Sequence, residues 1–254
     1  TEPASAASDV YKRQVGVDLI RTGKDDFYVL EDNCRTPSGV SYMLENREIM
    51  MKMFPDLFHS NRVLRVDDYP TRLLQTLMSL APKKCDSSVP TVVLLTPGHL
   101  NSAYYEHTFL SDQMGIEMVE AQDLFVENDF LYMKTVDGPK KIDVVYRRID
   151  DDYLDPLAYN PNSVIGVPGI THVYKTGGVN ICSAPGAGIA DDKAVYIYVP
   201  EMIKFYLGEI PILDNVQTWR CERDDDLKYV LENIDELVIK EVDGSGGHGM
   251  LIGP

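Results

Sequence analysis

The sequence has few of several residue types and patterns, and each shortage excludes a class of protein. Basic residues are scarce: 24 Lys and Arg stand against 40 Asp and Glu among 254 residues, which gives a formal net charge of −16. This charge argues against a general nucleic-acid binder and against docking on an anionic membrane, because both need a basic face. No run of 18 apolar residues is present, so no membrane-spanning segment is expected.

Cysteine and metal-binding histidine motifs are also scarce. The four cysteines, Cys34, Cys85, Cys182 and Cys221, are far apart and include no C-x-x-C pair. Neither a zinc cluster nor a disulfide scaffold is therefore expected, and reduced thiols in a cytoplasmic protein are the default. The histidines show no H-E-x-x-H spacing. Residues 1–14 lack an initiator methionine and an apolar core, so we expect a disordered leader rather than a signal peptide.

What is present is the pattern of a globular α/β chain. An apolar run at 91–95, a helical pattern through Met114 and a second strand at 116–119 predict a βαβ unit with a parallel sheet. The 3–4 spacing of apolar residues predicts further helices, and short apolar runs predict further strands. The predicted helices cover 45–53, 72–80, 193–207 and 224–237, and the predicted strands cover 15–20, 27–30, 130–135, 141–146 and 238–242.

The segment VIKEVDGSGGHGMLIG is the first that carries chemistry. Its glycines allow backbone N–H groups to approach a phosphate closely, and Lys240 in the preceding strand adds a fixed positive charge. The literal G-x-G-x-x-G does not fit a dinucleotide fold, because an extended run rather than a helix follows it. We therefore expect a strand, a phosphate-covering glycine loop and a second strand. A mobile turn between two strands explains the residues about equally well.

The segment GVDLIRTGKDDFYVLEDNCRTPSG is the second. Asp18, Glu31 and Asn33 supply three oxygen ligands of the kind that Mg²⁺ prefers. Glu31 and Asn33 share one face of an extended segment, and Asp18 on the neighbouring strand can meet them. Arg35 is in phase with both and could stabilise a transferring phosphoryl group. The alternative is an exposed acidic hairpin with a structural Arg–Glu pair.

Together with a lysine that opens a predicted helix, Lys193 in GIADDKAVYIYVP, these motifs resemble the ATP-grasp superfamily. The acidic hairpin precedes the glycine loop, whereas it follows that loop in ordinary members. The inverted order resembles the circularly permuted ATP-grasp family, related to glutathionylspermidine synthase-like ligases. The motifs LEDNCRTPSGVSYMLENR, VVYRRIDDDYLDPL and VIKEVDGSGGHGMLIGP carry this resemblance over roughly residues 15–254.

The resemblance implies an ATP- and Mg²⁺-dependent ligase. Such an enzyme forms an acyl phosphate from a carboxylate, which an amine or thiol then attacks to give an amide-type bond and ADP. By the same resemblance, Arg35 would be catalytic, and Asp18, Glu31 and Asn33 would hold Mg²⁺. ATP would be bound by Lys193 and Lys240 and by the loop residues Gly244, Ser245, Gly246, Gly247, His248 and Gly249. Arg147 and Arg148 are candidates for gripping a carboxylate substrate, and a structural Arg–Asp network is an equal alternative.

The resemblance also implies a division of the chain. Residues 1–14 would be the leader, 15–60 the magnesium-binding part of the ATP-grasp domain, 61–180 a substrate-side α/β domain, and 181–254 the nucleotide-binding part. The expected fold is α/β with α+β elements, an incomplete circularly permuted ATP-grasp fold. Adenine-contacting residues are expected beyond Pro254, so we expect an internal piece of a longer ligase. A non-catalytic ATP-binding module and, less favoured, a dinucleotide-dependent oxidoreductase are the alternatives.

Overall fold

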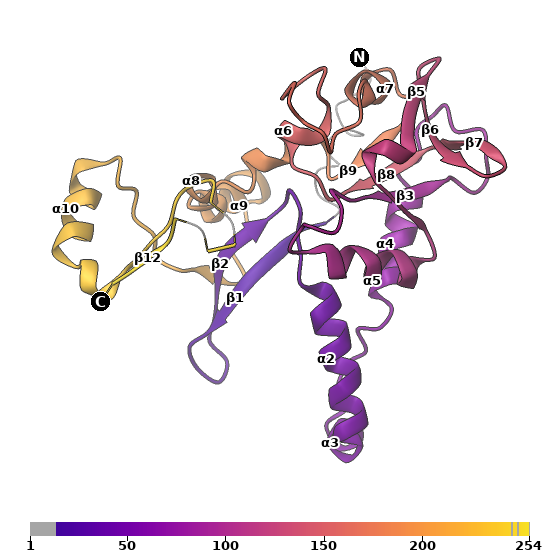
Figure 1. The fold of residues 1–254 in the computed structure, drawn as a ribbon. Helices are drawn as coiled ribbons and strands as arrows, with labels where there is room; N and C mark the ends of the chain where they lie inside the picture. Colours follow the sequence, from indigo (N-terminus) through magenta and orange to yellow (C-terminus); the bar gives the residue numbers. More distant parts are fainter. Residues whose placement is uncertain (1–13, 245, 248, 254) are drawn as a thin grey trace. The chain divides into compact units, whose positions relative to one another are not determined.

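The computed structural model of the chain describes residues 14–244, 246, 247 and 249–253. Figure 1 shows its helices and strands. The chain forms two compact units. The first unit contains Gln14 and residues 36–186, and the second contains residues 15–35 and the described residues from 187 onward. The second unit therefore joins the acidic hairpin to the glycine-rich end of the sequence.

A parallel sheet with the strand order β4-β3-β8-β9 forms the centre of the first unit. The two inner strands, β3 and β8, are buried along their whole length, as is typical of parallel sheets. Their bounds are Val92–Leu95 for β3, Glu117–Val119 for β4, Val144–Arg147 for β8 and Asn180–Cys182 for β9. Helix α5, Tyr104–Met114, connects β3 to the parallel strand β4, which confirms the predicted βαβ unit.

Two apolar clusters cover the opposite faces of this sheet, because successive side chains of a strand point to opposite sides. Val93, Leu95 and Val145 pack with side chains of the antiparallel sheet β5-β6-β7 and of α7. Val92 and Leu94 pack with side chains of α4 and α5. The bounds are Tyr69–Met78 for α4, Leu124–Glu127 for β5, Phe130–Thr135 for β6, Gly138–Ile142 for β7, Asp151–Leu154 for α6 and Ile170–Lys175 for α7. A 3₁₀ turn, Ala121–Asp123, precedes β5.

The second unit is built around the predicted acidic hairpin. Strands β1, Gly16–Arg21, and β2, Phe27–Asn33, are antiparallel, and the short strand β10, Asp214–Asn215, pairs with β2 in parallel. Strands β11 and β12 form a separate antiparallel pair. The remaining bounds are Ala187–Ile189 and Ile234–Glu236 for 3₁₀ turns, Lys193–Tyr196 for α8, Val199–Leu207 for α9, Asp224–Glu232 for α10, Val238–Ile239 for β11 and Leu251–Ile252 for β12.

Several predicted elements differ from the structure in their bounds; for example, the predicted helix 45–53 begins at Val40, and the predicted strand 238–242 ends at Ile239. The predicted helix 193–207 is two helices, because Pro200 lacks the N–H of a helix interior and instead occupies the first turn of α9. The predicted helix 224–237 ends at Glu232 and continues as a 3₁₀ turn. The predicted strand 141–146 is divided at Asp143, whose carboxylate accepts a hydrogen bond from the Thr91 N–H at 2.9 Å.

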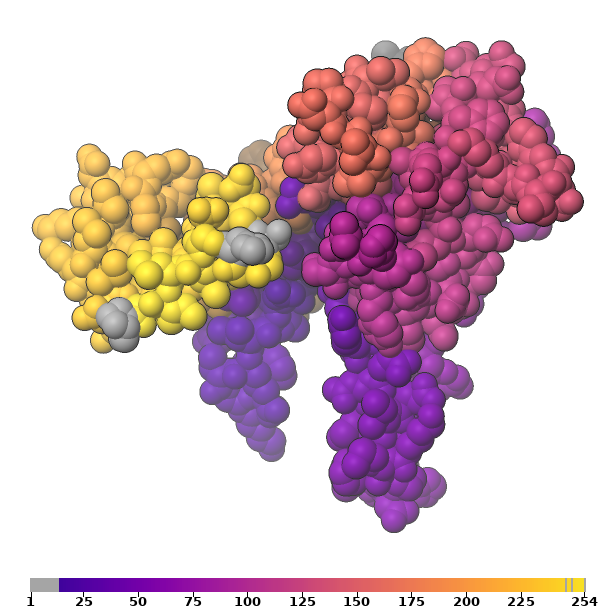
Figure 2. Space-filling model, in the orientation of Figure 1, coloured from indigo at the N-terminus to yellow at the C-terminus, as the bar shows by residue number. Residues whose placement is uncertain are grey.

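Residues 36–60 pack in the first unit, whereas the sequence analysis grouped 15–60 as one magnesium-binding part. Helix α2, Val40–Met53, and helix α3, Pro55–Asn61, form an arm that extends from the body of that unit (Figures 1 and 2). Which segments make up a functional domain stays a prediction. In the part of the chain that the structure describes, no helix is both long and apolar enough to cross a membrane.

Candidate functional site

The acidic face of the β1–β2 hairpin contains all three predicted magnesium ligands. Asp18 lies directly opposite Glu31 in the antiparallel register, so the two side chains share one face. Asn33 is two residues beyond Glu31 on the same strand and donates from Nδ2 to the Gly16 carbonyl at 3.3 Å. Leu30 has no partner in the register, because Asp18 pairs with Glu31 and Leu19 with Val29. This bulge locally increases the twist of the strand that holds Glu31.

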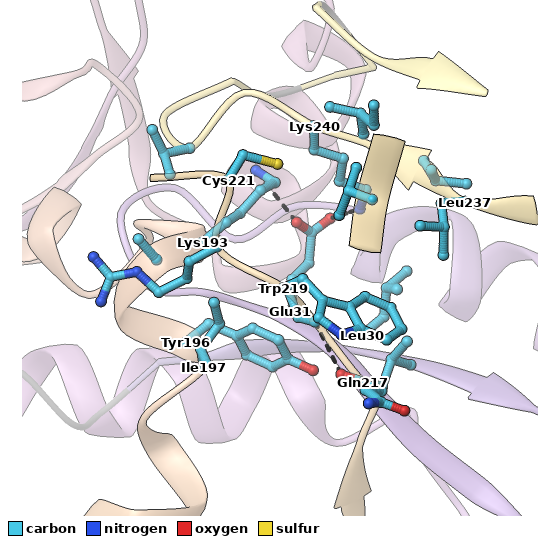
Figure 3. A pocket seen from close by; sticks show the side chains of 18 of the residues that line it. Leu30, Glu31, Lys193, Tyr196, Ile197, Gln217, Trp219, Cys221, Leu237 and Lys240 are labelled. Carbon is cyan, nitrogen blue, oxygen red and sulfur yellow. Dashed lines mark hydrogen bonds and ion pairs between the residues drawn. The ribbon is translucent and has the colours of Figure 1, made fainter. Parts of the chain in front are cut away.

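Both predicted nucleotide-binding lysines converge on Glu31 (Figure 3). The Lys193 ammonium lies 3.3 Å from Glu31 Oε2, and the Lys240 ammonium lies 3.5 Å from Glu31 Oε1. Each of the three side chains is less than one third exposed. Strand β2, the first residue of α8 and the residue that follows β11 therefore meet at one carboxylate.

Lys193 also anchors the glycine-rich loop. Its backbone N–H donates to the Val242 carbonyl at 3.0 Å, and its ammonium donates to the Gly244 carbonyl at 2.6 Å. Helix α8 begins here because the Asp192 carboxylate caps it, accepting from the Ala194 N–H at 2.7 Å. The start of α8 thus holds both the lysine head and the base of the loop.

The loop itself connects β11 and β12, so the predicted strand–loop–strand order is confirmed. Gly246, Gly247 and Gly249 have positive φ angles of 63°, 79° and 65°, conformations that favour glycine. Two predicted loop ligands, Ser245 and His248, lie outside the described residues. A strand rather than a helix follows the glycines, which is the arrangement that argued against a dinucleotide fold.

Arg35, the predicted catalytic residue, is held by a partner that the sequence analysis missed. The Asp191 carboxylate accepts from the backbone N–H groups of Cys34 and Arg35, the latter at 3.1 Å. It also forms an ion pair of 3.4 Å with the Arg35 guanidinium. Burial, followed by the charges of Asp191 and Asp32, raises the pKa of the Cys34 thiol to about 11. Asp191 is followed directly by Asp192, which caps α8. Nothing in the sequence of two adjacent aspartates indicates that one holds Arg35 and the other caps a helix.

A cavity of about 720 Å³ lies beside the two lysines. The volume is in the range of small-molecule sites. Trp219, Leu237 and Ile239 contribute apolar surface to its wall, and the Trp219 indole stacks on Tyr229 with ring centroids 4.8 Å apart. Tyr196 also lines it and donates from its hydroxyl to the Val29 carbonyl at 2.6 Å. These residues come from segments without a recognisable motif, so only the rarity of tryptophan could have drawn attention to one of them.

The two candidate substrate arginines lie in the first unit and are engaged by protein groups. Arg147 is fully buried and donates to the carbonyls of Ser183, Ile149 and Ala184 at 2.6, 2.7 and 3.1 Å. Its guanidinium also pairs with Asp151 at 2.7 Å. These contacts favour the structural alternative for Arg147. A role in gripping a substrate stays a prediction.

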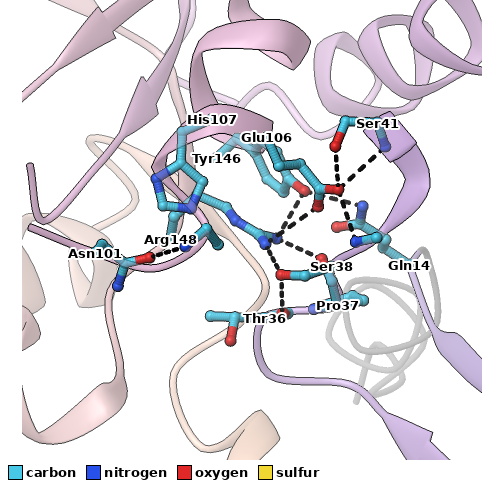
Figure 4. Close-up of polar contacts among 12 residues, drawn as sticks. Gln14, Thr36, Pro37, Ser38, Ser41, Asn101, Glu106, His107, Tyr146 and Arg148 are labelled. Carbon is cyan, nitrogen blue, oxygen red and sulfur yellow. Dashed lines mark hydrogen bonds and ion pairs between the residues drawn. The ribbon is translucent and has the colours of Figure 1, made fainter. Parts of the chain in front are cut away.

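Arg148 belongs to a buried polar cluster (Figure 4). It donates to the Pro37 carbonyl at 2.7 Å and to the Ser38 hydroxyl, and it lies 3.5 Å from the Glu106 carboxylate. Glu106 in turn accepts from the N–H groups of Gly39 and Ser41 at 2.7 and 3.1 Å. Gly39 and Ser41 flank the first residue of α2. Glu106 therefore accepts hydrogen bonds from backbone N–H groups that would otherwise lack an acceptor at that helix end.

The chemistry of the second unit can be stated from these contacts. Two ammonium groups beside an apolar-walled cavity suit a ligand with a polyanionic end and a planar apolar end. Two carboxylates and one amide on a shared face suit a hard divalent cation. Within the described ranges, no group of three or more His, Cys, Asp or Glu side chains is placed to hold a metal ion. No disulfide links the four cysteines, all of which the structure describes.

Comparison with known proteins adds a family. A family model described as a circularly permuted ATPgrasp matches residues 4–254. An uncharacterized protein of Synechocystis sp. is 52% identical over 239 residues, which are 94% of this chain and 49% of that protein. An uncharacterized protein of Mycobacterium tuberculosis is 53% identical over 240 residues, which are 94% of this chain and 43% of that protein.

A further relative carries an enzyme name. The protein called "Putative glutamate--cysteine ligase 2-3" of Frankia alni is 41% identical over 239 residues, which are 94% of this chain and 28% of that protein. The chain thus spans about half the length, or less, of these curated relatives.

Proposed function

This chain belongs to the circularly permuted ATP-grasp family, and on that premise we propose that it binds ATP and Mg²⁺ for a carboxylate–amine or carboxylate–thiol ligase. The observation that carries the proposal is the convergence of Lys193 and Lys240 on Glu31 beside a cavity. The family match and a relative named as a glutamate–cysteine ligase support the ligase class. A reaction of the glutathionylspermidine synthase kind, in which a peptide carboxylate is joined to an amine, belongs to the same chemical class.

In the proposed complex the lysines bind phosphate oxygens. An ammonium group suits phosphate because it is a compact charge with several donors, and the glycine loop adds backbone N–H groups. The face of Trp219 and the side chain of Leu237 offer apolar surface to the adenine. This assignment adds adenine contacts within the chain to those expected beyond Pro254.

The proposed metal ligands are Asp18, Glu31 and Asn33. Their oxygen atoms are the donors that Mg²⁺ prefers, and the Asp18–Glu31 register places the two carboxylates on one face. Mg²⁺, when bound, would neutralise phosphate charge. Glu31 contributes only once its lysine partners have turned toward a ligand, since both of its oxygens are paired with ammonium groups.

The proposed reaction has two balanced steps. A substrate carboxylate oxygen attacks the γ-phosphorus, the bond to the bridging oxygen breaks, and ADP leaves together with the electron pair of that bond. The nitrogen or sulfur of the second substrate then attacks the acyl carbon, loses its proton, and displaces phosphate. Arg35, fixed by Asp191, is proposed to stabilise the transferring phosphoryl charge.

Calorimetric titration with Mg·ATP tests the nucleotide site. Replacing Lys240 by Ala removes a charge-assisted contact worth about 1.5–3 kcal/mol, which corresponds to about a tenfold or larger loss of affinity. In a full-length protein that contains this chain, Glu31→Ala should abolish ADP release in the presence of amino-acid and peptide carboxylates with amine acceptors. Lys204→Ala, an exposed lysine of α9 in the same unit, is the matched control and should leave both measurements unchanged.

Unchanged affinity in the Lys240 variant, or full ADP release by Glu31→Ala, would refute the site assignment. ATP binding without ADP release by the full-length protein under every substrate mixture would instead support the non-catalytic nucleotide-binding alternative.

A further inference from the structure

Glu31 occupies the position between the two lysines that an anionic ligand would need. One oxygen of its carboxylate faces Lys193 and the other faces Lys240, at 3.3 and 3.5 Å. All three side chains are largely shielded from water, with exposed fractions of 20% for Glu31, 20% for Lys193 and 29% for Lys240. Figure 3 shows the carboxylate pointing into the gap between the two amines. The carboxylate therefore stabilises two like charges that would otherwise repel each other.

The pairing of Glu31 with both lysines affects how an anionic ligand can bind. A polyphosphate can engage the lysines only if they release Glu31, which leaves an unpaired carboxylate facing an anion. Asp18, directly opposite Glu31 in the register, adds a second negative charge to that face. Like charges this close destabilise each other, more so where water is partly excluded. A divalent cation on the face of Glu31 and Asp18 removes that repulsion, because it is attracted to carboxylates and phosphate alike.

We propose, on the basis of the proposed ATP site, that Glu31 acts as a metal-dependent gate for the nucleotide. Without a divalent cation Glu31 holds Lys193 and Lys240 and excludes polyphosphate. With the cation it transfers to the metal and frees both lysines for the phosphates. Glu31 thus selects Mg·ATP over metal-free ATP before any chemistry takes place. This role differs from that of a metal ligand alone, since a simple ligand has no reason to weaken binding in the absence of metal.

The test measures ATP affinity with and without metal. Calorimetry gives the dissociation constant in EDTA and in excess Mg²⁺, and the fluorescence of Trp219, the one tryptophan of the sequence, reports from the cavity wall. The wild-type chain should bind ATP much more weakly in EDTA than in Mg²⁺. Glu31→Gln removes the charge at nearly constant size and should bind ATP in EDTA about tenfold or more tightly than the wild type, equivalent to about 1.4 kcal/mol. Its gain from added Mg²⁺ should shrink accordingly.

Glu236→Gln is the matched control. Glu236 lines the same cavity, and its replacement removes the same charge without touching the Glu31 ion pairs. It should keep the wild-type dependence on Mg²⁺. Circular dichroism melting of each variant verifies that it is folded.

The outcomes separate the gate from the proposed function. If Glu31→Gln binds ATP in EDTA no better than the wild type while the wild type binds Mg·ATP, the gate is wrong and the ATP site stands. If Glu236→Gln shows the same gain in EDTA, the effect is one of general charge and the gate is again wrong. If the wild-type chain binds ATP under neither condition, the proposed function fails and the gate with it.

Discussion

His107 is a buried side chain whose charge state couples pH to the stability of the first unit. Its Nδ1 lies 2.9 Å from the Thr96 hydroxyl, which itself accepts from the Gly98 N–H at 3.2 Å. The Thr96 hydroxyl hydrogen is thus available to Nδ1, which accepts it in the neutral ring. Burial, with a smaller effect of the Arg148 charge, lowers the pKa of His107 to about 3. The folded chain therefore keeps this histidine neutral where the unfolded chain, with a pKa near 6.5, begins to protonate it.

We predict a loss of stability on acidification that depends on His107. Between its unfolded pKa and about pH 3 the unfolded state binds more protons, so the free energy of unfolding falls as the pH falls, by up to about 1.4 kcal/mol per pH unit from this group. Urea unfolding of wild type and His107→Asn at pH 7, 6 and 5 measures the difference. The variant should have the shallower slope, whereas His59→Asn, an exposed control, should match the wild type. Parallel profiles for all three proteins would contradict the prediction.

Individual residues differ in how far the sequence can assign them. Lys240 and the glycine loop could be predicted because a lysine in a strand before several glycines is a local pattern. Asp191 and Trp219 could not, because one acts through the distant Cys34–Arg35 backbone and the other through a cavity wall. The pairing of Glu31 with both lysines could not be foreseen either. It depends on tertiary contacts between segments at opposite ends of the chain.

At the scale of elements, helix α2 depends on a side chain from another helix. Glu106 of α5 is buried, and one of its oxygens accepts from Gly39 N, Ser41 N and the Ser41 hydroxyl, the last at 2.9 Å. Its second oxygen lies 3.5 Å from the Arg148 guanidinium. Gly39, at the N-terminal cap position of α2, has no side chain that could supply such a cap.

We therefore predict that Glu106→Ala strongly destabilises the first unit. The change leaves Arg148 without its buried counter-charge and α2 without its cap, and breaking a buried pair in this way costs about 3–5 kcal/mol. Denaturant unfolding measures the loss, and hydrogen exchange should show lost protection in α2. Glu48→Ala removes an exposed ion pair with Lys52 within α2 and should leave the free energy of unfolding nearly unchanged, because water screens exposed pairs. Equal costs for the two variants would show that Glu106 does not support α2.

The helices and strands could be predicted where a local pattern of apolar residues marks them. The prediction of their bounds was wrong where a polar contact or a proline ends the element. The unit of β3, α5 and β4 follows from two short apolar runs and the length of the segment between them. The division of the predicted strand 141–146 could not be predicted in this way. Asp143 interrupts the strand, and its carboxylate accepts a hydrogen bond from the Thr91 N–H. The break between α8 and α9 was signalled by Pro200, but the apolar spacing continues across it and suggests one helix.

At the scale of the whole molecule, the two units differ in how much apolar surface they bury. Both apolar clusters of the described residues lie in the first unit. In the described part of the second unit, the buried apolar residues are Ala187, Tyr196 and Val230. Its exposed apolar side chains are large: Phe205 and Tyr206 are 81% and 77% exposed. Because apolar burial is the main favourable contribution to folding, we expect the second unit to be the less stable of the two.

We therefore predict two separable unfolding transitions in urea. Trp219 lies in the second unit and is the chain's one tryptophan, so its fluorescence reports the unfolding of that unit. The far-ultraviolet circular dichroism comes mostly from the helices of the larger first unit. The fluorescence should therefore change at a lower urea concentration than the circular dichroism. A Trp219→Phe chain that carries Phe109→Trp moves the probe into the first unit, where its transition should follow the later one. Saturating Mg·ATP should delay the Trp219 transition alone, since a ligand stabilises the unit that binds it. Coincident transitions for both probes, in the presence and absence of the nucleotide, would show instead that the two units unfold as one cooperative body.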